Sequence, residues 1–291
     1  MRRVKLIVAY DGTGYRGWQA QKTEPLTIEG KLREALQKLI PKEAETLQLI
    51  GASRTDAGVH AKGNVAVFDT ESTIPASNFP AAINGKLPED IRVLEAQDMP
   101  LDFHPRYAKH EKHYSYRIDN RRIPDPLGRL YHYNYTYPLR LDRMCEAAFY
   151  MLGTHDFTSF VNPDSQVFQH GGDAIREIYS IRIIAKTSES NAPNIVLDAA
   201  RPELEAASIS KAMQYDEVKI DICGSGFLYH QIRIMVGTLL QAGIGKLDPK
   251  DVDEILAAKD RTKAGPTVPA CGLMLEELKY DDIGNADRSN H

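Results

Sequence analysis

The stretch GASRTDAGVHA, residues 51–61, lies between two segments that alternate polar and apolar side chains, 46–50 and 64–70. Alternation with a period of two is typical of strands, and glycines between two strands indicate a turn. The stretch is therefore predicted to close a β-hairpin. It places Arg54 and Asp56 two positions apart. The glycines leave room for a ligand beside such a carboxylate, although an aspartate that only closes its own turn is the commoner case.

The hairpin belongs to a strand, helix, hairpin, helix, strand order in the first part of the chain. The predicted elements are a strand at 3–10, a helix at 28–39 capped by Thr27, hairpin strands at 46–50 and 64–70, a helix within 75–87 and a strand at 91–96. This is the split arrangement of small α+β domains of the ferredoxin type. Met-Pro and His-Pro steps between 99 and 110 indicate a hinge after it.

A second α+β series follows the hinge, in an order that suggests a divergent duplicate of the first. Its predicted elements are strands at 113–118 and 130–137, a helix at 142–152, strands at 178–185 and 217–223, helices at 229–242 and from 249 onwards, and a strand at 272–280. Segment 186–216 is interpreted as an elaboration between two hairpin strands. We expect an N-terminal domain at 1–106, a C-terminal domain at 107–283 and a flexible tail at 284–291.

The composition indicates a globular protein without a membrane span. The chain has 291 residues, and its longest apolar run near the start, 6–10, is far too short for a signal peptide or a membrane helix. We therefore expect a cytoplasmic protein. The three scattered cysteines indicate neither disulfides nor a cysteine zinc site. Because His110 and His113 are three apart on a predicted strand and face opposite sides, no metal site is expected there.

Charge is unevenly distributed along the chain, although its sum is only −4. Residues 1–33 hold seven basic against three acidic side chains, and residues 106–132 hold the same numbers. Acidic side chains predominate at 188–221, by seven to three, and from 250 to the end, by nine to six. A basic face that binds nucleic acid and chance clustering on solvated faces are both compatible with this pattern.

Aromatic and basic side chains of the second half supply further candidates. Tyr114 lies on the strand predicted at 113–118, where core packing is the usual role but a phenol face can also stack on a nucleobase. On the helix predicted at 229–242, Arg233 falls outside the apolar stripe and is either a surface charge or a partner for a carboxylate of the first half. Core or interface packing is the interpretation for four tyrosines that would share one strand face, at 131, 133, 135 and 137.

Six strings of the chain share a family resemblance. They are YDGTGYRGWQ (10–19), GASRTDAGVHA (51–61), DFHPRYAKHEKHYSYRI (102–118), HDFTSF (155–160), GSGFLYHQIRIMVG (224–237) and AAKDRTKAGPTVPACGL (257–273). Together, and in this order, they resemble the tRNA pseudouridine synthase A family over nearly the whole chain. The resemblance implies an α+β pseudouridine synthase fold with two ferredoxin-like (RRM-like) halves, a mainly antiparallel mixed sheet and an active-site cleft between the halves.

The resemblance also implies an activity and a role for each candidate residue. Members of this family isomerise uridines 38, 39 and 40 of the tRNA anticodon stem-loop to pseudouridine, as homodimers and without a cofactor or metal. By the motif match Asp56 is the essential carboxylate, either a nucleophile or a base at the ribose. Arg233 would hold it ionised, Tyr114 would stack on the target uracil and take the C5 proton, and Leu273 would cover the other face of the ring. Arg54 would fill the space left by the extruded uridine or bind a phosphate.

Two other functions fit parts of the pattern. A tRNA-binding protein that has lost catalysis would keep the basic stretches and would not need Asp56. A nucleosidase that hydrolyses the same bond would call for paired carboxylates or a bound metal, and neither is indicated near the turn. Because Asp56, Tyr114 and Arg233 are all present, the sequence favours the synthase.

Overall fold

The computed structural model describes residues 1–20, 26–163, 165, 168, 171–187, 194–202 and 211–281. The chain forms two compact units, one from Met1 to Glu111 together with the C-terminal segment from Met274, and one from Lys112 to Leu273. Each unit combines a mainly antiparallel sheet with helices, so the predicted α+β class is confirmed. The predicted domain boundaries at 106/107 and 283/284 stay a prediction. The predicted tail at 284–291 lies outside the described residues.

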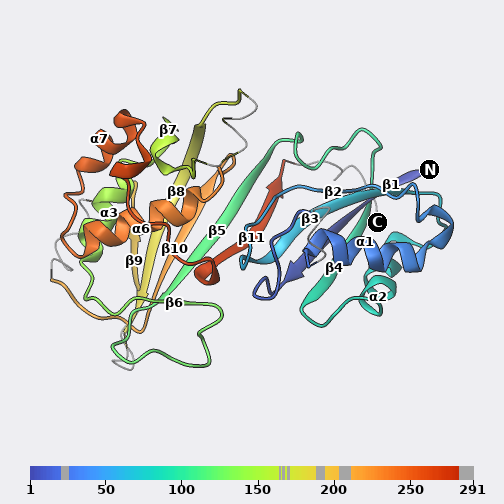
Figure 1. Ribbon diagram of the computed structural model, residues 1–291, viewed down its shortest axis with the longest axis horizontal. Coiled ribbons are helices and arrows are strands. Elements are labelled where there is room, and N and C mark those ends of the chain that lie inside the picture. Colours follow the sequence, from blue (N-terminus) through green and yellow to red (C-terminus); the bar gives the residue numbers. More distant parts are fainter. Residues whose placement is uncertain are drawn as a thin grey trace, which may run out of the picture. The chain divides into compact units, whose positions relative to one another are not determined.

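The first unit has the predicted strand, helix, hairpin, helix, strand order (Figure 1). Its elements are β1 (Arg2–Tyr10), α1 (Ile28–Leu39), β2 (Leu49–Gly51), β3 (His60–Thr70), α2 (Phe79–Asn84) and β4 (Ile91–Met99), joined by β11 (Leu273–Tyr280). Strands β4, β1 and β3 lie side by side and antiparallel. The other edge of β3 pairs antiparallel with β2, at Ile50↔Val67, and parallel with β11, at Met274↔His60.

Burial in the first unit follows the strand periodicity and the helix periodicity of the sequence. Alternate side chains of β1 face the core, and the buried stripe of α1 repeats at steps of three and four. Thr27 caps α1 as predicted, because its side chain accepts a hydrogen bond from Gly30 N at 3.2 Å. The fully buried side chains of these two elements are Val4, Leu6, Val8, Ile28, Leu32 and Leu36.

The second unit has a longer series of elements. They are β5 (His110–Asp119), β6 (Tyr133–Asn134), α3 (Leu141–Phe149), β7 (Gly153–Asp156), β8 (Ile175–Lys186), β9 (Ile195–Asp198), β10 (Glu217–Gly224), α6 (Gln231–Gly243) and α7 (Asp251–Ala258). Strands β5, β10, β8 and β7 follow one another antiparallel, β9 pairs with β8, and β6 runs parallel to the end of β5.

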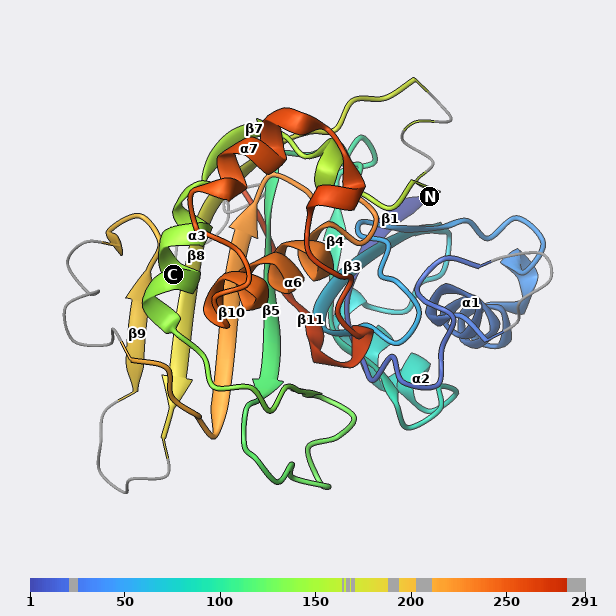
Figure 2. The same cartoon turned by 60° about the vertical axis from the view of Figure 1, so that its left-hand side comes forward.

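Helices α3 and α6 pack against each other on one face of this sheet (Figure 2). Their contact is close, since a Cβ on Gly243 of α6 would lie 2.8 Å from the Met144 side chain of α3. The side chains of α6 are buried on almost every side of the helix, in agreement with the broad apolar stripe in its sequence. Within the described ranges, the helices are all too short or too polar to cross a bilayer.

The prediction of a tyrosine-rich strand at 130–137 is wrong for most of that range. Strand pairing is limited to Tyr133–Asn134, and Tyr137 is 62% exposed. The reason is Asn120, whose buried side-chain amide donates to the carbonyl oxygens of Tyr135 and Tyr137 at 2.6 and 2.9 Å. A side chain thus takes the place of a neighbouring strand, and the four rings do not form one buried face.

Within its described residues, segment 186–216 contains a strand that the sequence analysis did not predict. Strand β9 lies within it and pairs with β8 at Ile183↔Leu197. Residues 188–193 and 203–210 of the segment are outside the described ranges. The segment therefore extends the sheet, at least through β9.

Candidate active site

The predicted hairpin turn is confirmed. Residues 52–59 join β2 to β3 and lie outside the strand ladder. Asp56 is half-buried in this turn and Arg54 is exposed. Val59 N donates to Asp56 O at 3.2 Å, and Gly58 between them has a φ of 78°, in the left-handed region that favours glycine. The chain therefore turns sharply just after Asp56.

A loop that follows β1, residues 11–18, packs against the turn. Trp18 N donates to Thr55 O at 3.1 Å. Gly58 N donates to Tyr15 O at 3.2 Å. These bonds hold the backbone on both sides of Asp56 without using a strand ladder.

Two glycines make this approach possible. A Cβ on Gly12 would lie 2.0 Å from Val59 O, and a Cβ on Gly17 would lie 2.5 Å from Thr55 O. No real Cβ approaches a backbone oxygen so closely, so larger residues would push the loop off the turn. The strings YDGTGYRGWQ and GASRTDAGVHA therefore occur together for a structural reason.

Buried polar side chains fix the floor of the turn. The hydroxyl oxygens of Tyr10 and Thr55 lie 2.8 Å apart, and both residues are buried. The fully buried Asn64 donates from Nδ2 to Ser53 O at 3.0 Å. Buried polar groups that all have partners select one arrangement, because any other leaves a group unpaired at a cost of about 1 to 3 kcal/mol.

Two arginines give the turn a positive rim. Arg106 donates from Nε to Gly51 O at 2.7 Å, at the start of the turn. Partial desolvation, followed by the positive charge of Arg106, lowers the pKa of Arg54. A guanidinium group is suited to binding an anion such as a phosphate.

In the second unit, β5 positions Tyr114 opposite Ile222 of β10. Tyr114 is only 6% exposed, so its ring is part of a wall and not a surface side chain. The ring of Phe227 meets it edge-on, with ring centroids 5.4 Å apart and an interplanar angle of 83°. Edge-to-face contact holds an aromatic ring in a fixed plane.

Helix α6 carries Arg233, which is half-buried. Its Nε donates to Val268 O at 2.7 Å. One turn later, a Cβ on Gly237 would lie 1.9 Å from Pro266 O. We call residues 264–272 the strap, because this segment, which ends in the short 3₁₀ helix Ala270–Gly272, lies directly on α6 and accepts the hydrogen bond from Arg233 Nε.

The strap ends against β5. Tyr116 donates from its hydroxyl to Pro269 O at 2.7 Å, and burial raises the pKa of Tyr116, which keeps the hydroxyl protonated as a donor. A Cβ on Gly272 would lie 2.7 Å from both the Tyr116 ring and Arg117 O. Leu273 follows at once, 6% exposed, at the first position of β11.

A family model described as tRNA pseudouridine synthase matches residues 6–108 and 147–281 of this chain. The chain belongs to the tRNA pseudouridine synthase family. The two matched ranges contain the turn, the loop before it, helix α6 and the strap.

Individual pseudouridine synthases match over the same length. The tRNA pseudouridine synthase A of Thermoanaerobacter sp. (strain X514) is 40% identical over 280 residues, which cover 96% of this chain and 100% of that protein. The proteins of the same name from Clostridium acetobutylicum and Bacillus pumilus are 41% and 38% identical, with the same coverage. The predicted resemblance to the tRNA pseudouridine synthase A family is confirmed.

The predicted site residues of this pseudouridine synthase fall into two groups. Asp56 and Arg54 lie on the turn of the first unit. The second unit carries the other three, Tyr114, Arg233 and Leu273. Within each group the residues are held by neighbouring segments of the same unit, and their roles in the reaction stay predictions.

Two further residues belong to these groups and were not singled out from the sequence. In the sequence, Arg106 is one charge of the basic stretch 106–132, and Phe227 is one letter of the string 224–237. The available signal was their place inside the family-like strings 102–118 and 224–237. Their contacts, to Gly51 and Tyr114, depend on segments far away in the sequence and could not be read from spacing.

Proposed function

We propose that this isomerase converts uridine to pseudouridine in the anticodon arm of tRNA, at positions 38, 39 and 40, with Asp56 as its essential carboxylate. The observation that carries the proposal is the Asp56 turn. A main-chain hydrogen bond from Val59 N to Asp56 O closes it. The loop 11–18 holds the backbone from the other side, which gives the half-buried carboxylate a fixed direction.

The chemistry requires one carboxylate and no net oxidation or reduction. The bond from ribose C1′ to uracil N1 breaks, the base turns over, and C1′ bonds to C5. The proton on C5 leaves and N1 ends with a proton, so atoms and charges balance. The ionised Asp56 acts either as the nucleophile that carries the opened intermediate or as the base at the ribose, and both roles need the same geometry.

A uridine in a stem or loop must leave its stack before a protein group can reach C1′, at a cost of a few kcal/mol. Arg54 lies on the turn and Arg106 is bonded to Gly51 O at its start, and these guanidinium groups offer a place for the phosphate of such an extruded nucleotide. The Tyr114 ring, fixed edge-on by Phe227, offers a flat face for the uracil, and base stacking of this kind contributes about 1 to 3 kcal/mol. We assign the removal of the C5 proton to the Tyr114 hydroxyl.

Arg233 and Leu273 complete the proposal. The strap restrains Arg233 through Nε, so the direction of its guanidinium is restricted. We assign it to pair with Asp56 and keep that carboxylate ionised, since a charge-assisted pair is the common way to do so. Leu273, buried at the start of β11, supplies an apolar surface for the second face of the uracil.

Replacing Asp56 by asparagine tests the proposal directly. The variant should lose pseudouridine formation by a factor of at least roughly 10² to 10⁴, the range that positioned acid–base groups contribute, while it binds tRNA with nearly unchanged affinity. Unmodified tRNA transcripts are incubated with the protein, and pseudouridine is mapped by carbodiimide modification and primer extension. Asp98→Asn is the matched control, because Asp98 forms an exposed ion pair with Arg2 in the same unit.

The two outcomes have distinct meanings. Product formation at the wild-type rate by Asp56→Asn contradicts the assigned role of the carboxylate. A wild-type protein that binds the transcripts but forms no pseudouridine in them contradicts the proposed substrate positions. The homodimer that the family resemblance implies and the cytoplasmic location expected from the composition belong to the same proposal. Light scattering on the purified protein tests the dimer.

A further inference from the structure

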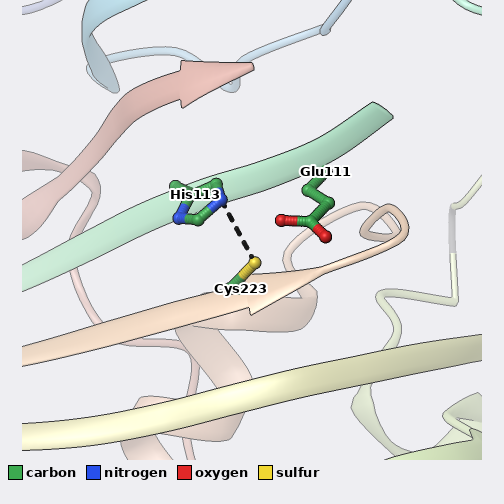
Figure 3. Close-up of side chains that lie close together, drawn as sticks. All are labelled: Glu111, His113 and Cys223. Carbon is green, nitrogen blue, oxygen red and sulfur yellow. Dashed lines mark hydrogen bonds between the residues drawn. The ribbon is translucent and has the colours of Figure 1, made fainter. Parts of the chain in front are cut away.

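Among the described residues, three side chains able to bind a metal gather on one face of the paired strands β5 and β10, outside the site proposed above (Figure 3). They are Glu111 and His113 of β5 and Cys223 of β10. Their donor atoms all lie within 4.8 Å of one another. The closest pair is Cys223 Sγ and His113 Nε2, at 3.4 Å.

Strand geometry accounts for the cluster. His113 and Cys223 are direct partners in the antiparallel register of β5 and β10, so their side chains project from the same face. Glu111 stands two residues before His113 on the same strand, and residues i and i+2 share a face. The unbroken strand β5, from His110 to Asp119, therefore sets the distance between Glu111 and His113.

The donor set suits a borderline-soft divalent ion. Zinc binds thiolate, imidazole and carboxylate groups at about 2.0 to 2.3 Å, which places tetrahedral ligands roughly 3.5 Å apart. The measured Sγ to Nε2 distance already has this value, and the long Glu111 side chain can supply the remaining adjustment. A thiolate and a carboxylate together neutralise a 2+ charge, whereas magnesium and calcium prefer oxygen ligands alone.

Burial indicates how the ion would reach the site. Cys223 is only 7% exposed, whereas Glu111 and His113 are half-buried. Solvent therefore reaches the cluster from the side of Glu111, where a water molecule can occupy the fourth position. Consecutive strand residues face opposite sides, so the cluster lies on the face of β5 opposite the Tyr114 side chain.

We propose that Glu111, His113 and Cys223 form a zinc-class metal site that links β5 to β10. Its role is structural, because the bound ion would fix the register of the strand pair that carries Tyr114 on its other face. The proposal is independent of the isomerase mechanism, which uses none of these three groups.

Cobalt(II) and zinc(II) titrations of the full-length protein test the site. Cobalt(II) should bind one ion per chain with a thiolate-to-cobalt absorption band, and zinc(II) should displace it. Cys223→Ser should lose the band. His113→Ala and Glu111→Gln should weaken zinc binding by more than about tenfold, the lower bound for loss of even an outer-sphere partner. Cys271→Ser is the matched control, since Cys271 lies near the His132 carbonyl and away from the cluster, and it should bind cobalt(II) as the wild type does.

Thermal unfolding provides a second readout that does not depend on the absorption band. Zinc should raise the Tm of the wild type and of Cys271→Ser in a concentration-dependent way, and should leave the Tm of Cys223→Ser unchanged. Absence of stoichiometric cobalt(II) binding by the wild type overturns the proposal. So does a cobalt(II) spectrum retained in Cys223→Ser, or rapid iodoacetamide labelling of Cys223 that zinc does not slow, which would instead mark a reactive thiol.

Discussion

At the Asp56 turn and on the Arg233 side of α6, two segments pack closely against each other at a glycine. The two places differ in the kind of element to which that glycine belongs. Gly12 and the turn it touches are both irregular backbone, held by a few hydrogen bonds and buried polar groups. Gly237 belongs to a regular helix, and only its partner segment, the strap, is irregular. The direction of Asp56 therefore depends on loop contacts, whereas the place of Arg233 is set by the regular helix that carries it.

The largest expected effect is that of Gly12→Ala. The new Cβ would lie 2.0 Å from Val59 O, a backbone atom that cannot rotate away. The free energy of unfolding should fall by about 3 kcal/mol, the upper end of overpacking costs, and pseudouridine formation should fall with it because the Asp56 turn is displaced. Urea denaturation and the carbodiimide assay measure the two effects.

Gly14→Ala is the control for that change. Gly14 belongs to the same loop, and a Cβ there would meet nothing within 4 Å. Its free energy of unfolding should stay within about 0.5 kcal/mol of the wild type. Equal destabilisation by the two alanines would show that the loop does not press on the turn.

Gly237→Ala should have the next largest effect. The Cβ clash with Pro266 O, at 1.9 Å, is opposed by the better helix propensity of alanine, worth about 1 kcal/mol. We expect a net loss of about 1 to 2 kcal/mol in unfolding free energy and a smaller loss of activity than for Gly12→Ala. Gly226→Ala, where a Cβ meets nothing within 4 Å, serves as the control. A loss of activity larger than that of Gly12→Ala would reverse the comparison.

Arg54→Gln should change tRNA binding and leave stability nearly unchanged. Arg54 is exposed on the turn, and one lost phosphate contact should cost about 1 kcal/mol of binding free energy. The slope of log Kd against log salt concentration should decrease by about 0.7 to 0.9. Arg182→Gln, which removes an exposed arginine from β8, is the matched control. An unchanged slope for Arg54→Gln would remove this arginine from the binding surface.

The smallest expected effect concerns a charged pair of the second unit. Glu217, whose Oε1 lies 3.7 Å from His132 Nε2, raises the pKa of His132. The His132 ring, followed by Lys186, lowers the pKa of Glu217 to about 2. The histidine contribution is present below its ordinary pKa and is lost as pH rises through the raised value. The glutamate contribution is present above its ordinary pKa and is lost as pH falls towards about 2.

Comparison of the wild type with His132→Gln by urea denaturation measures this pair. The difference in unfolding free energy should be about 1 kcal/mol or less near pH 5 and should vanish at alkaline pH, where the ring is neutral. Lys246→Gln, which leaves the pair intact, is the control. A difference that stays constant with pH would mean that His132 contributes through contacts and not through charge.

Local patterns predicted those elements whose burial is decided by their own periodicity. The alternation of β1 and the three-and-four spacing of α1 led to the correct element types and nearly correct ends. The same reasoning failed at 130–137, where alternating tyrosines resemble a strand but Asn120 binds the carbonyl oxygens that a neighbouring strand would need. It also missed β9, because the sequence IVLD of Ile195–Asp198 has three apolar residues in a row and does not alternate.

The identities of the site residues follow from the family-like strings, because a turn with Arg54 and Asp56, a strand tyrosine and a helix arginine are local features of the chain. The sequence by itself therefore determined the types of the strongly periodic elements, the family and the candidate chemistry. Tertiary structure alone decided which distant segments contact one another. Examples are the loop at Gly12 against Val59, and His113 against Cys223, which are 110 positions apart. The physical reason is that periodicity records whether a side chain is buried, whereas its partner is set by sheet register and by the close contacts that only the folded chain contains.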